Sequence, residues 1–123
     1  MKILGVHHVQ ITVPKAAEKR AKDFYCGVLA LQEIEKPEAL KGRGGFWVSV
    51  GNADVHISIE EGFDRLTTKS HIAYQVEDID YWKNKLGKEN VKISSSIPIP
   101  GYERFEFRDP FGNRVEMIQI VNS

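Results

Sequence analysis

The sequence is poor in cysteine and carries no net charge. Its one cysteine, Cys26, excludes an intrachain disulfide, and lysine plus arginine (17) balance aspartate plus glutamate (17). The basic residues are scattered, which gives no electrostatic basis for binding nucleic acid or an anionic membrane surface. We therefore expect neither as a partner. Cys26 lies in an expected helix without a neighbouring base, so we interpret it as a packing residue.

Long apolar runs are also missing. The first segment, MKILGVHHVQITV, is interrupted by His7, His8 and Gln10. It is too short and too polar for a signal peptide or a membrane span. We therefore expect a cytoplasmic protein. The 123 residues have the length of one domain, which we place over 1–123.

Apolar and polar residues alternate in several segments, as they do in strands with one buried face. The pattern predicts strands at 3–13, 31–35, 46–50 and 53–60, and again at 71–76, 91–95, 102–108 and 114–120. Apolar residues at helical spacing predict helices at 15–30 and 78–89. Loops are expected at 36–45, 61–69 and 97–101.

The order strand, helix, three strands occurs twice, which indicates an internal duplication. HVQITV at 8–13 aligns with HIAYQV at 71–76, and Gly51–His56 aligns with Gly112–Glu116 if one residue is dropped. Each half is too small to bury its own sheet face, so the halves should pair or swap with a partner. The sequence therefore predicts an α+β fold of two βαβββ modules, over about 3–60 and about 70–121.

Four potential metal ligands lie on matching strands of the two modules. His8 and His71 are on the first strands, and His56 and Glu116 are on the last. Apolar neighbours of opposite parity turn the three histidines away from the helices, toward the face that a curved sheet makes concave. His7 has the opposite parity to His8, so we expect it to point away from this cavity.

The direction of Glu116 is less firmly set, because Ile118 and Ile120 share its parity. Imidazole and carboxylate together suit a divalent zinc, iron, nickel, cobalt or manganese ion. The alternative is four isolated polar residues with local hydrogen bonds. The symmetric placement on matching strands favours one shared metal site.

Three further residues are candidates for a substrate pocket. Trp47 lies on the third strand of the first module, and Tyr102 and Arg104 lie on its counterpart in the second. An aromatic ring and a guanidinium near the mouth of a cavity would hold an anionic substrate. The alternative is a core tryptophan and a surface arginine. The glycine-rich loop Gly42–Gly45 is expected to lie over the cavity.

These features resemble the glyoxalase / bleomycin resistance protein / extradiol dioxygenase superfamily, also called vicinal oxygen chelate proteins. The matching stretches are 8–13, Phe24-Tyr25 followed by Leu29 and Leu31, 55–57, 71–74 and, most specifically, DPFGNRVE at 109–116. The resemblance covers nearly the whole chain. It implies that the modules curve into an open mixed sheet around a central cavity that holds one divalent metal, and that the chain forms a homodimer.

By this resemblance, His8, His71 and Glu116 match the two-histidine, one-glutamate metal site of the dioxygenases and of fosfomycin-resistance enzymes. Glu116 is then both a ligand and a catalytic carboxylate. His56 lies where lactoylglutathione lyases carry a further ligand, usually glutamate, and this departure weakens the lyase assignment. We recognise no potassium-binding loop like that of the fosfomycin enzymes, so that activity is ranked low.

The resemblance implies a metal-dependent lyase, isomerase or dioxygenase that acts on a small substrate chelated through neighbouring oxygens. The alternative is a metal-free binding protein that sequesters a ligand, as bleomycin resistance proteins do. The retained ligand residues favour the enzyme.

Overall fold

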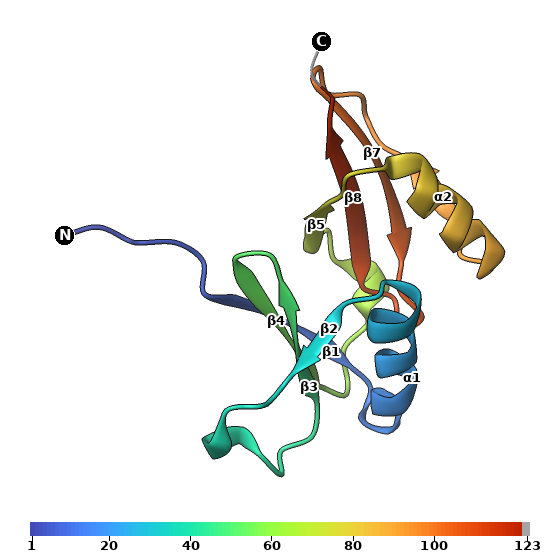
Figure 1. Ribbon diagram of the computed structural model, residues 1–123. Helices are drawn as coiled ribbons and strands as arrows, with labels where there is room; N and C mark the ends of the chain where they lie inside the picture. The colour runs from blue at the N-terminus through green and yellow to red at the C-terminus, as the bar shows by residue number, and fades with distance from the viewer. Residues whose placement is uncertain (122–123) are drawn as a thin grey trace. The chain divides into compact units, whose positions relative to one another are not determined.

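The structure is a computed structural model in which residues 1–121 are described. The chain divides into two compact units, residues 1–63 and the residues from 64 onward. Each unit contains one four-stranded mixed sheet (Figure 1). None of the helices in the described residues is long and apolar enough to cross a membrane.

The first unit contains β1 (His8–Val13), β2 (Gln32–Ile34), β3 (Phe46–Val50) and β4 (Ala53–Ile59) in the sheet order β1-β4-β3-β2. Strand β1 runs parallel to β4, and the other pairs are antiparallel. The helical segments are η1 (Lys15–Ala17), α1 (Glu18–Lys22), η2 (Asp23–Val28) and η3 (Glu38–Leu40).

The second unit repeats this topology. It contains η4 (Arg65–Thr67), β5 (His71–Gln75), α2 (Ile79–Lys88), β6 (Ile93–Ser95), β7 (Tyr102–Arg108) and β8 (Arg114–Ile120). The sheet order β5-β8-β7-β6 matches that of the first unit strand for strand, with β5 parallel to β8. The predicted α+β class with two βαβββ modules is therefore confirmed.

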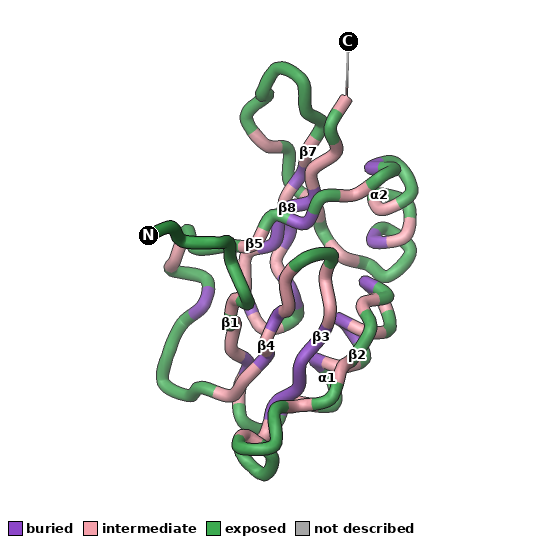
Figure 2. The backbone as a smooth tube through the Cα atoms, turned by 60° about the vertical axis from the view of Figure 1, so that its left-hand side comes forward, coloured by how far each residue is buried: buried purple, intermediate pink, exposed green. Residues whose placement is uncertain are grey.

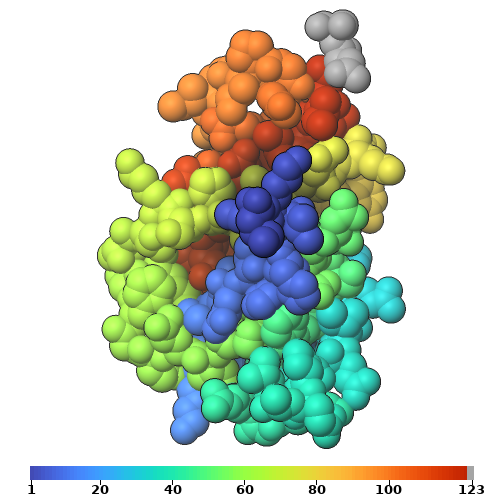
Figure 3. Space-filling model, turned by 90° about the vertical axis from the view of Figure 1, so that its left-hand side faces the viewer, coloured from blue at the N-terminus to red at the C-terminus, as the bar shows by residue number. Residues whose placement is uncertain are grey.

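The first strand begins later than the sequence predicts, at His8 and not at Ile3. Its neighbour β4 starts at Ala53, and the amide of Asp54 already donates to the carbonyl of His7. The residues before His7 therefore have no strand beside them. Ile3 and Leu4 are exposed, and the N-terminal segment extends away from β1 (Figures 1 and 3).

The helix expected at 15–30 is divided into a 3₁₀ turn, a short α-helix and a π-helical segment. In the π-helical segment the amide of Leu29 donates to the carbonyl of Phe24, 2.9 Å away. The adjacent residues Phe24 and Tyr25 are both buried there. The wider winding therefore coincides with the burial of two consecutive aromatic side chains.

The apolar faces of the strands form the core of each unit, as alternation predicts. Buried residues include Val55 and Ile57 in the first unit and Phe105 and Val115 in the second. Figure 2 shows stretches of buried backbone, in purple, along the strands. The opposite faces of the two sheets carry the polar candidates of the sequence analysis. Helix α2 begins at an N-cap, Asp78, whose side chain accepts from the amide of Tyr81.

Candidate functional site

A histidine and two glutamates lie together on one face of the second unit's sheet. Glu106 on β7 is paired directly opposite Glu116 on β8, and His71 begins the adjacent strand β5. The Nε2 atom of His71 lies 3.0 Å from Oε1 of Glu116. One ligand atom from each of the three residues lies within 4.8 Å of the others. This trio is the only such group of metal-ligating side chains in residues 1–121.

The hydrogen bond of Nδ1 indicates which ring nitrogen of His71 presents its lone pair to the carboxylate in a neutral ring. Its Nδ1 lies 2.9 Å from the carbonyl oxygen of Lys69. A carbonyl only accepts, so Nδ1 carries the hydrogen, and in a neutral ring the lone pair is on Nε2. That lone pair then faces Oε1 of Glu116 at 3.0 Å. Two acceptors at this distance need either a hydrogen between them, on Nε2 or on the carboxyl group, or a metal ion.

The same geometry fits a divalent ion. Two ligands about 2.1 Å from an ion and at a right angle to each other lie about 3.0 Å apart. A metal-ligating histidine also typically donates its other N–H to a backbone carbonyl, which fixes the ring. The Lys69 carbonyl has this role for His71. His71 and Glu116 therefore fit the metal that the sequence predicts.

Two arginines accompany the carboxylates. Arg114 donates from Nε and Nη2 to the two oxygens of Glu106, at 3.0 and 2.7 Å. Nη1 of Arg104 lies 3.3 Å from Oε2 of Glu116, while Nε and Nη2 of the same arginine donate to the carbonyl of Ile97. The hydrogen bond from Arg114 lowers the pKa of Glu106, against the opposing effect of burial. Glu106 is thus held as a carboxylate, the form that binds a cation.

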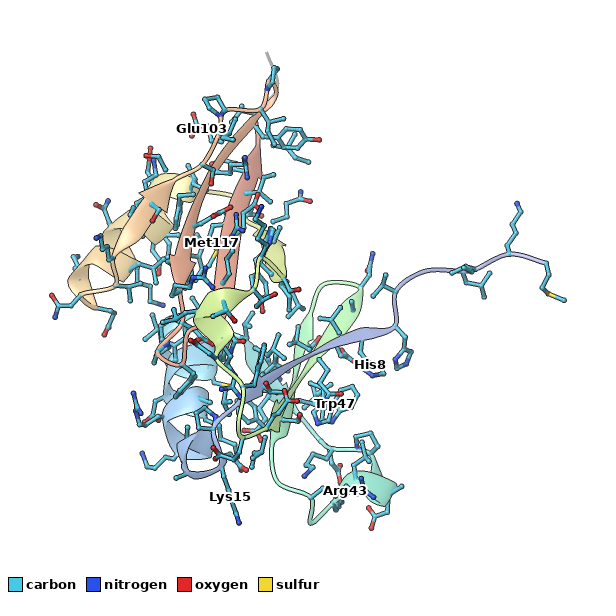
Figure 4. The ribbon with its side chains drawn as sticks, turned by 180° about the vertical axis from the view of Figure 1, so that it is seen from behind. His8, Lys15, Arg43, Trp47, Glu103 and Met117 are labelled. Atoms are coloured by element: carbon cyan, nitrogen blue, oxygen red, sulfur yellow. The ribbon has the colours of Figure 1, made fainter. Side chains whose placement is uncertain are left out.

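In the first unit, the positions that match Glu106 and Glu116 carry aromatic rings, those of Trp47 and His56. Trp47 on β3 lies directly opposite His56 on β4, and their rings are stacked with centroids 4.6 Å apart. The His8 ring lies 4.8 Å from Trp47 on the same face of the sheet (Figure 4). Trp47 is buried, and its Nε1 is one of two buried side-chain donors or acceptors in the described residues without a hydrogen-bond partner.

The polar face of this sheet forms the floor of an open cavity of about 700 Å³. Its walls come from β1, β3, β4 and the segment between β2 and β3, including Leu40, Arg43 and Gly44. Two residues of the glycine-rich loop, Arg43 and Gly44, therefore line a cavity within this unit, and its place over a central cavity stays a prediction. Burial lowers the pKa of His56, and the nearby His8 and Lys36 lower it further. His56 is thus a neutral imidazole near neutral pH.

The expectation that His7 points away from the cavity is wrong. His7 lines the cavity, and its Nδ1 lies 3.0 Å from Nδ1 of His8. Alternation applies only within a strand, and His7 precedes the first residue of β1.

The predicted ligands divide between the two units. His8 and His56 belong to the first unit, and His71 and Glu116 belong to the second. The structure brings His71 and Glu116 into direct contact. Their convergence with His8 and His56 on one ion stays a prediction.

The predicted pocket residues also differ in their surroundings. Trp47 lines the first unit's cavity, Arg104 contacts Glu116, and Tyr102 is exposed at the start of β7, outside both groups. Glu106 was not singled out in the sequence. Two features of the sequence could have identified it. Glu106 points to the same side of its strand as Arg104, and its position in the second module matches that of Trp47 in the first.

The comparisons with known proteins agree with this architecture. The family model for the Glyoxalase/Bleomycin resistance protein/Dioxygenase superfamily matches residues 5–117. The chain belongs to this superfamily. No curated protein sequence matches it significantly.

Among solved structures, a glyoxalase family protein from Bacillus anthracis is similar, with 38% identity over 98% of both chains and a TM-score of 0.89. The fosfomycin resistance protein FosX from Listeria monocytogenes, solved with Mn(II) and sulfate, has 16% identity, a TM-score of 0.74, and coverage of 99% of this chain and 93% of FosX. TnmS3, an antibiotic binding protein from Streptomyces sp. CB03234, has 21% identity, a TM-score of 0.72 and 98% coverage of both chains. At these identities the last two show the fold alone.

Proposed function

We propose that this protein is a metal-dependent enzyme, a lyase, isomerase or dioxygenase, whose small substrate is chelated through neighbouring oxygens. The ion is held by His71 and Glu116, with Glu106 beside them. The observation that carries the proposal is the 3.0 Å distance between Nε2 of His71 and Oε1 of Glu116, with Nδ1 of His71 on the carbonyl of Lys69. The superfamily membership and the manganese of FosX support it.

A divalent ion at this position would act as a Lewis acid on the substrate oxygens. The residues around it have separate tasks. Lys69 fixes the His71 ring through its carbonyl, and Arg104 holds the second oxygen of Glu116. Glu116 is therefore left with Oε1 as its free ligand atom, beside His71. As a buried carboxylate it is also our candidate for accepting a substrate proton.

A second candidate is a metal-free protein that sequesters a small ligand. TnmS3, which shares the fold, is an antibiotic binding protein. The observation in favour of this candidate is that Arg104 and Arg114 already contact Glu116 and Glu106. These ion pairs would stabilise the carboxylates without a metal if His71 were protonated.

Cobalt(II) distinguishes the two candidates, because its visible absorption reports both binding and the replacement of ligands. We expect the protein to bind one cobalt ion and the spectrum to change when the bidentate oxygen ligand acetohydroxamate is added. Glu116→Gln should bind cobalt at least about tenfold more weakly. Glu103→Gln removes an exposed carboxylate from β7 and should bind like wild type. Equal binding in all three proteins, or in none, would overturn the metal proposal.

A chelation signal alone does not distinguish an enzyme from a metal-containing binding protein. The loaded protein should therefore turn over at least one member of a panel of hemithioacetals, catechols and epoxides. Turnover should be lost in Glu116→Gln and retained in Glu103→Gln. Binding of acetohydroxamate without turnover of any panel member would favour the sequestering function.

A further inference from the structure

The guanidinium of Arg104 connects two parts of the second unit. Its Nε and Nη2 donate to the carbonyl of Ile97, at 3.1 and 2.7 Å, and its Nη1 lies 3.3 Å from Oε2 of Glu116. The side chains of Arg104 and Glu116 are only 15% and 7% exposed. Because a guanidinium is planar and rigid, the two hydrogen bonds at one edge set the direction of Nη1. The Ile97 carbonyl thus fixes the group that holds Oε2 of Glu116.

The segment that supplies this carbonyl, residues 97–101, has little conformational freedom. Pro98 and Pro100 each fix their own φ angle, and Pro98 also restricts the residue before it to an extended backbone. At the other end of the segment, the carbonyl of Gly101 accepts from the amide of Val121 at 2.9 Å. The Arg104 guanidinium is therefore anchored on a rigid support.

The side chain of Ile97 contributes little to the packing of the unit, since the residue is 80% exposed. Figure 3 shows the 97–101 segment, in orange, at the surface of the second unit. The contribution of Ile97 to the interior is its backbone carbonyl, which accepts both hydrogen bonds from Arg104. A surface segment is thus connected to the buried carboxylate of Glu116 through one arginine.

Glu116 benefits from this connection as a ligand. A glutamate side chain has several rotatable bonds, and fixing its carboxylate costs conformational entropy. A ligand group that is already oriented loses less of this freedom when it binds. In Glu116, Oε2 faces Arg104 and Oε1 lies 3.0 Å from Nε2 of His71. The contact with Arg104 therefore favours the rotamer in which Oε1 faces His71.

We propose that Arg104 is a positioning residue, anchored on the Ile97 carbonyl, which fixes the Glu116 carboxylate with Oε1 toward His71. The 97–101 segment is then a remote determinant of metal affinity, although it supplies no ligand. That the fixed carboxylate serves a metal ion rests on the proposed function. That Arg104 fixes Glu116 does not.

A double-mutant cycle in the presence of a chelator tests the pair without any metal. Urea unfolding is measured for wild type, Arg104→Gln, Glu116→Gln and the double variant. Because the two side chains are in contact, the unfolding constant of the double variant should differ at least about threefold from the product of the single effects. Independent effects of the two substitutions would overturn the proposal, whether or not the protein binds a metal.

Cobalt(II) affinity then tests whether the fixed orientation serves metal binding. Arg104→Gln should bind cobalt about tenfold more weakly, which is the effect typical of residues that orient a metal ligand. Arg104→Lys keeps the charge without the planar fork, so it should recover only part of this loss. The direction of the change is decisive, because removing a nearby positive charge would by itself strengthen the binding of a cation. Cobalt binding by Arg104→Gln as tight as that of wild type, or tighter, would overturn the proposal.

Two further variants test the 97–101 segment while Arg104 stays in place. Pro98→Gly loosens the backbone next to the Ile97 carbonyl and should weaken cobalt binding by about threefold. Ser96→Ala is the matched control, because the buried Oγ of Ser96 has no hydrogen-bond partner. It should bind cobalt like wild type. Equal affinities of these two variants would overturn the role of the segment.

The outcomes distinguish this proposal from the proposed function. Coupling in the metal-free cycle, with no cobalt binding by any of the proteins, would overturn the proposed function and support the positioning of Glu116 by Arg104. Independent effects in the cycle, with normal cobalt binding by wild type, would overturn the positioning and leave the metal function in place. Circular dichroism of each variant verifies that a loss of binding is not a loss of folding.

Discussion

Glu106 stands directly opposite Glu116 across the β7–β8 ladder, so two carboxylates share one face of the sheet. Like charges placed directly opposite each other destabilise a sheet unless cations compensate them. Arg104 and Arg114 compensate these two charges, and Nε2 of His71 lies 3.0 Å from the other oxygen of Glu116. The proposed metal site uses this arrangement.

The ion pair between Glu106 and Arg114 should make stability depend on pH. The pKa of Glu106 is lowered in the folded protein, mainly by its hydrogen bond from Arg114. A carboxyl group whose pKa is lowered by folding stabilises the fold at pH values above its pKa in the unfolded chain, about 4.3. This stabilisation is lost as the pH falls through the pKa of the group in the folded protein. Glu106→Gln should therefore be less stable than wild type by about 1 kcal/mol at pH 7, with the difference disappearing in acid.

Urea unfolding of both proteins between pH 7 and pH 3 measures this difference. Glu103→Gln, which removes an exposed carboxylate on the same strand, should differ little from wild type at any of these pH values. A Glu106→Gln deficit that stays constant down to pH 3 would contradict the assignment to the ion pair.

Trp47 should report the protonation of His56 by fluorescence. The rings are stacked 4.6 Å apart, and a protonated imidazole quenches a neighbouring indole. Burial lowers the pKa of His56, so quenching should begin only as the pH falls and should have its midpoint below the ordinary value of about 6.5. The measurement uses a Trp82→Phe, His8→Gln background, in which Trp47 is the remaining tryptophan and His56 is the remaining histidine ring against it. Adding His56→Gln should remove this transition, and a midpoint above 6.5 would show that His56 is not held neutral.

Gly45 should tolerate alanine much less well than Gly42. Both have positive φ, +81° and +90°, but a Cβ meets the Ile57 carbonyl at Gly45 and nothing within 4 Å at Gly42. Gly42→Ala should cost about 1 kcal/mol, and Gly45→Ala on the order of 2–4 kcal/mol, because the second adds a backbone clash to the strain. Denaturant midpoints measure both. Equal losses would mean that the loop can move away from β4.

Asp109 should be a strong determinant of stability in the second unit. Its buried carboxylate accepts from the amides of Phe111 and Asn113 and from Nδ2 of Asn113, at 2.8–2.9 Å. Asp109→Ala leaves these donors without their acceptor and should cost about 2–4 kcal/mol. Asp109→Asn keeps one oxygen and should cost less. A loss below about 0.5 kcal/mol for alanine would contradict this role for the turn.

The fold was largely predictable because it depends on local patterns. Alternation gave β7 and β8 with the bounds that the structure shows, and Asp78 marked the start of α2. The errors occurred where pairing or packing overrides the pattern. Residues 3–6 lack a neighbouring strand, and the helix expected at 15–30 is broken by the π-helical winding in which Phe24 and Tyr25 are buried.

The candidate site was less predictable, because contacts between strands depend on register. Matching positions in the repeat pointed to His71 and Glu116, which are in contact. Register then placed Glu106 opposite Glu116 and Trp47 opposite His56, and neither pairing follows from one strand alone. Arg43 lies in an irregular loop, where no periodicity indicates the direction of a side chain.

Elemental analysis of metal bound to the native protein tests the central claim most directly. Wild type and Glu103→Gln, purified without a chelator or an affinity metal, should each carry close to one equivalent of a divalent transition metal. Glu116→Gln and His71→Ala should carry little, because the first loses the charged carboxylate and the second loses the imidazole. Equal metal content in all four proteins, or none in wild type even after incubation with manganese, zinc, iron, nickel and cobalt, would contradict the account.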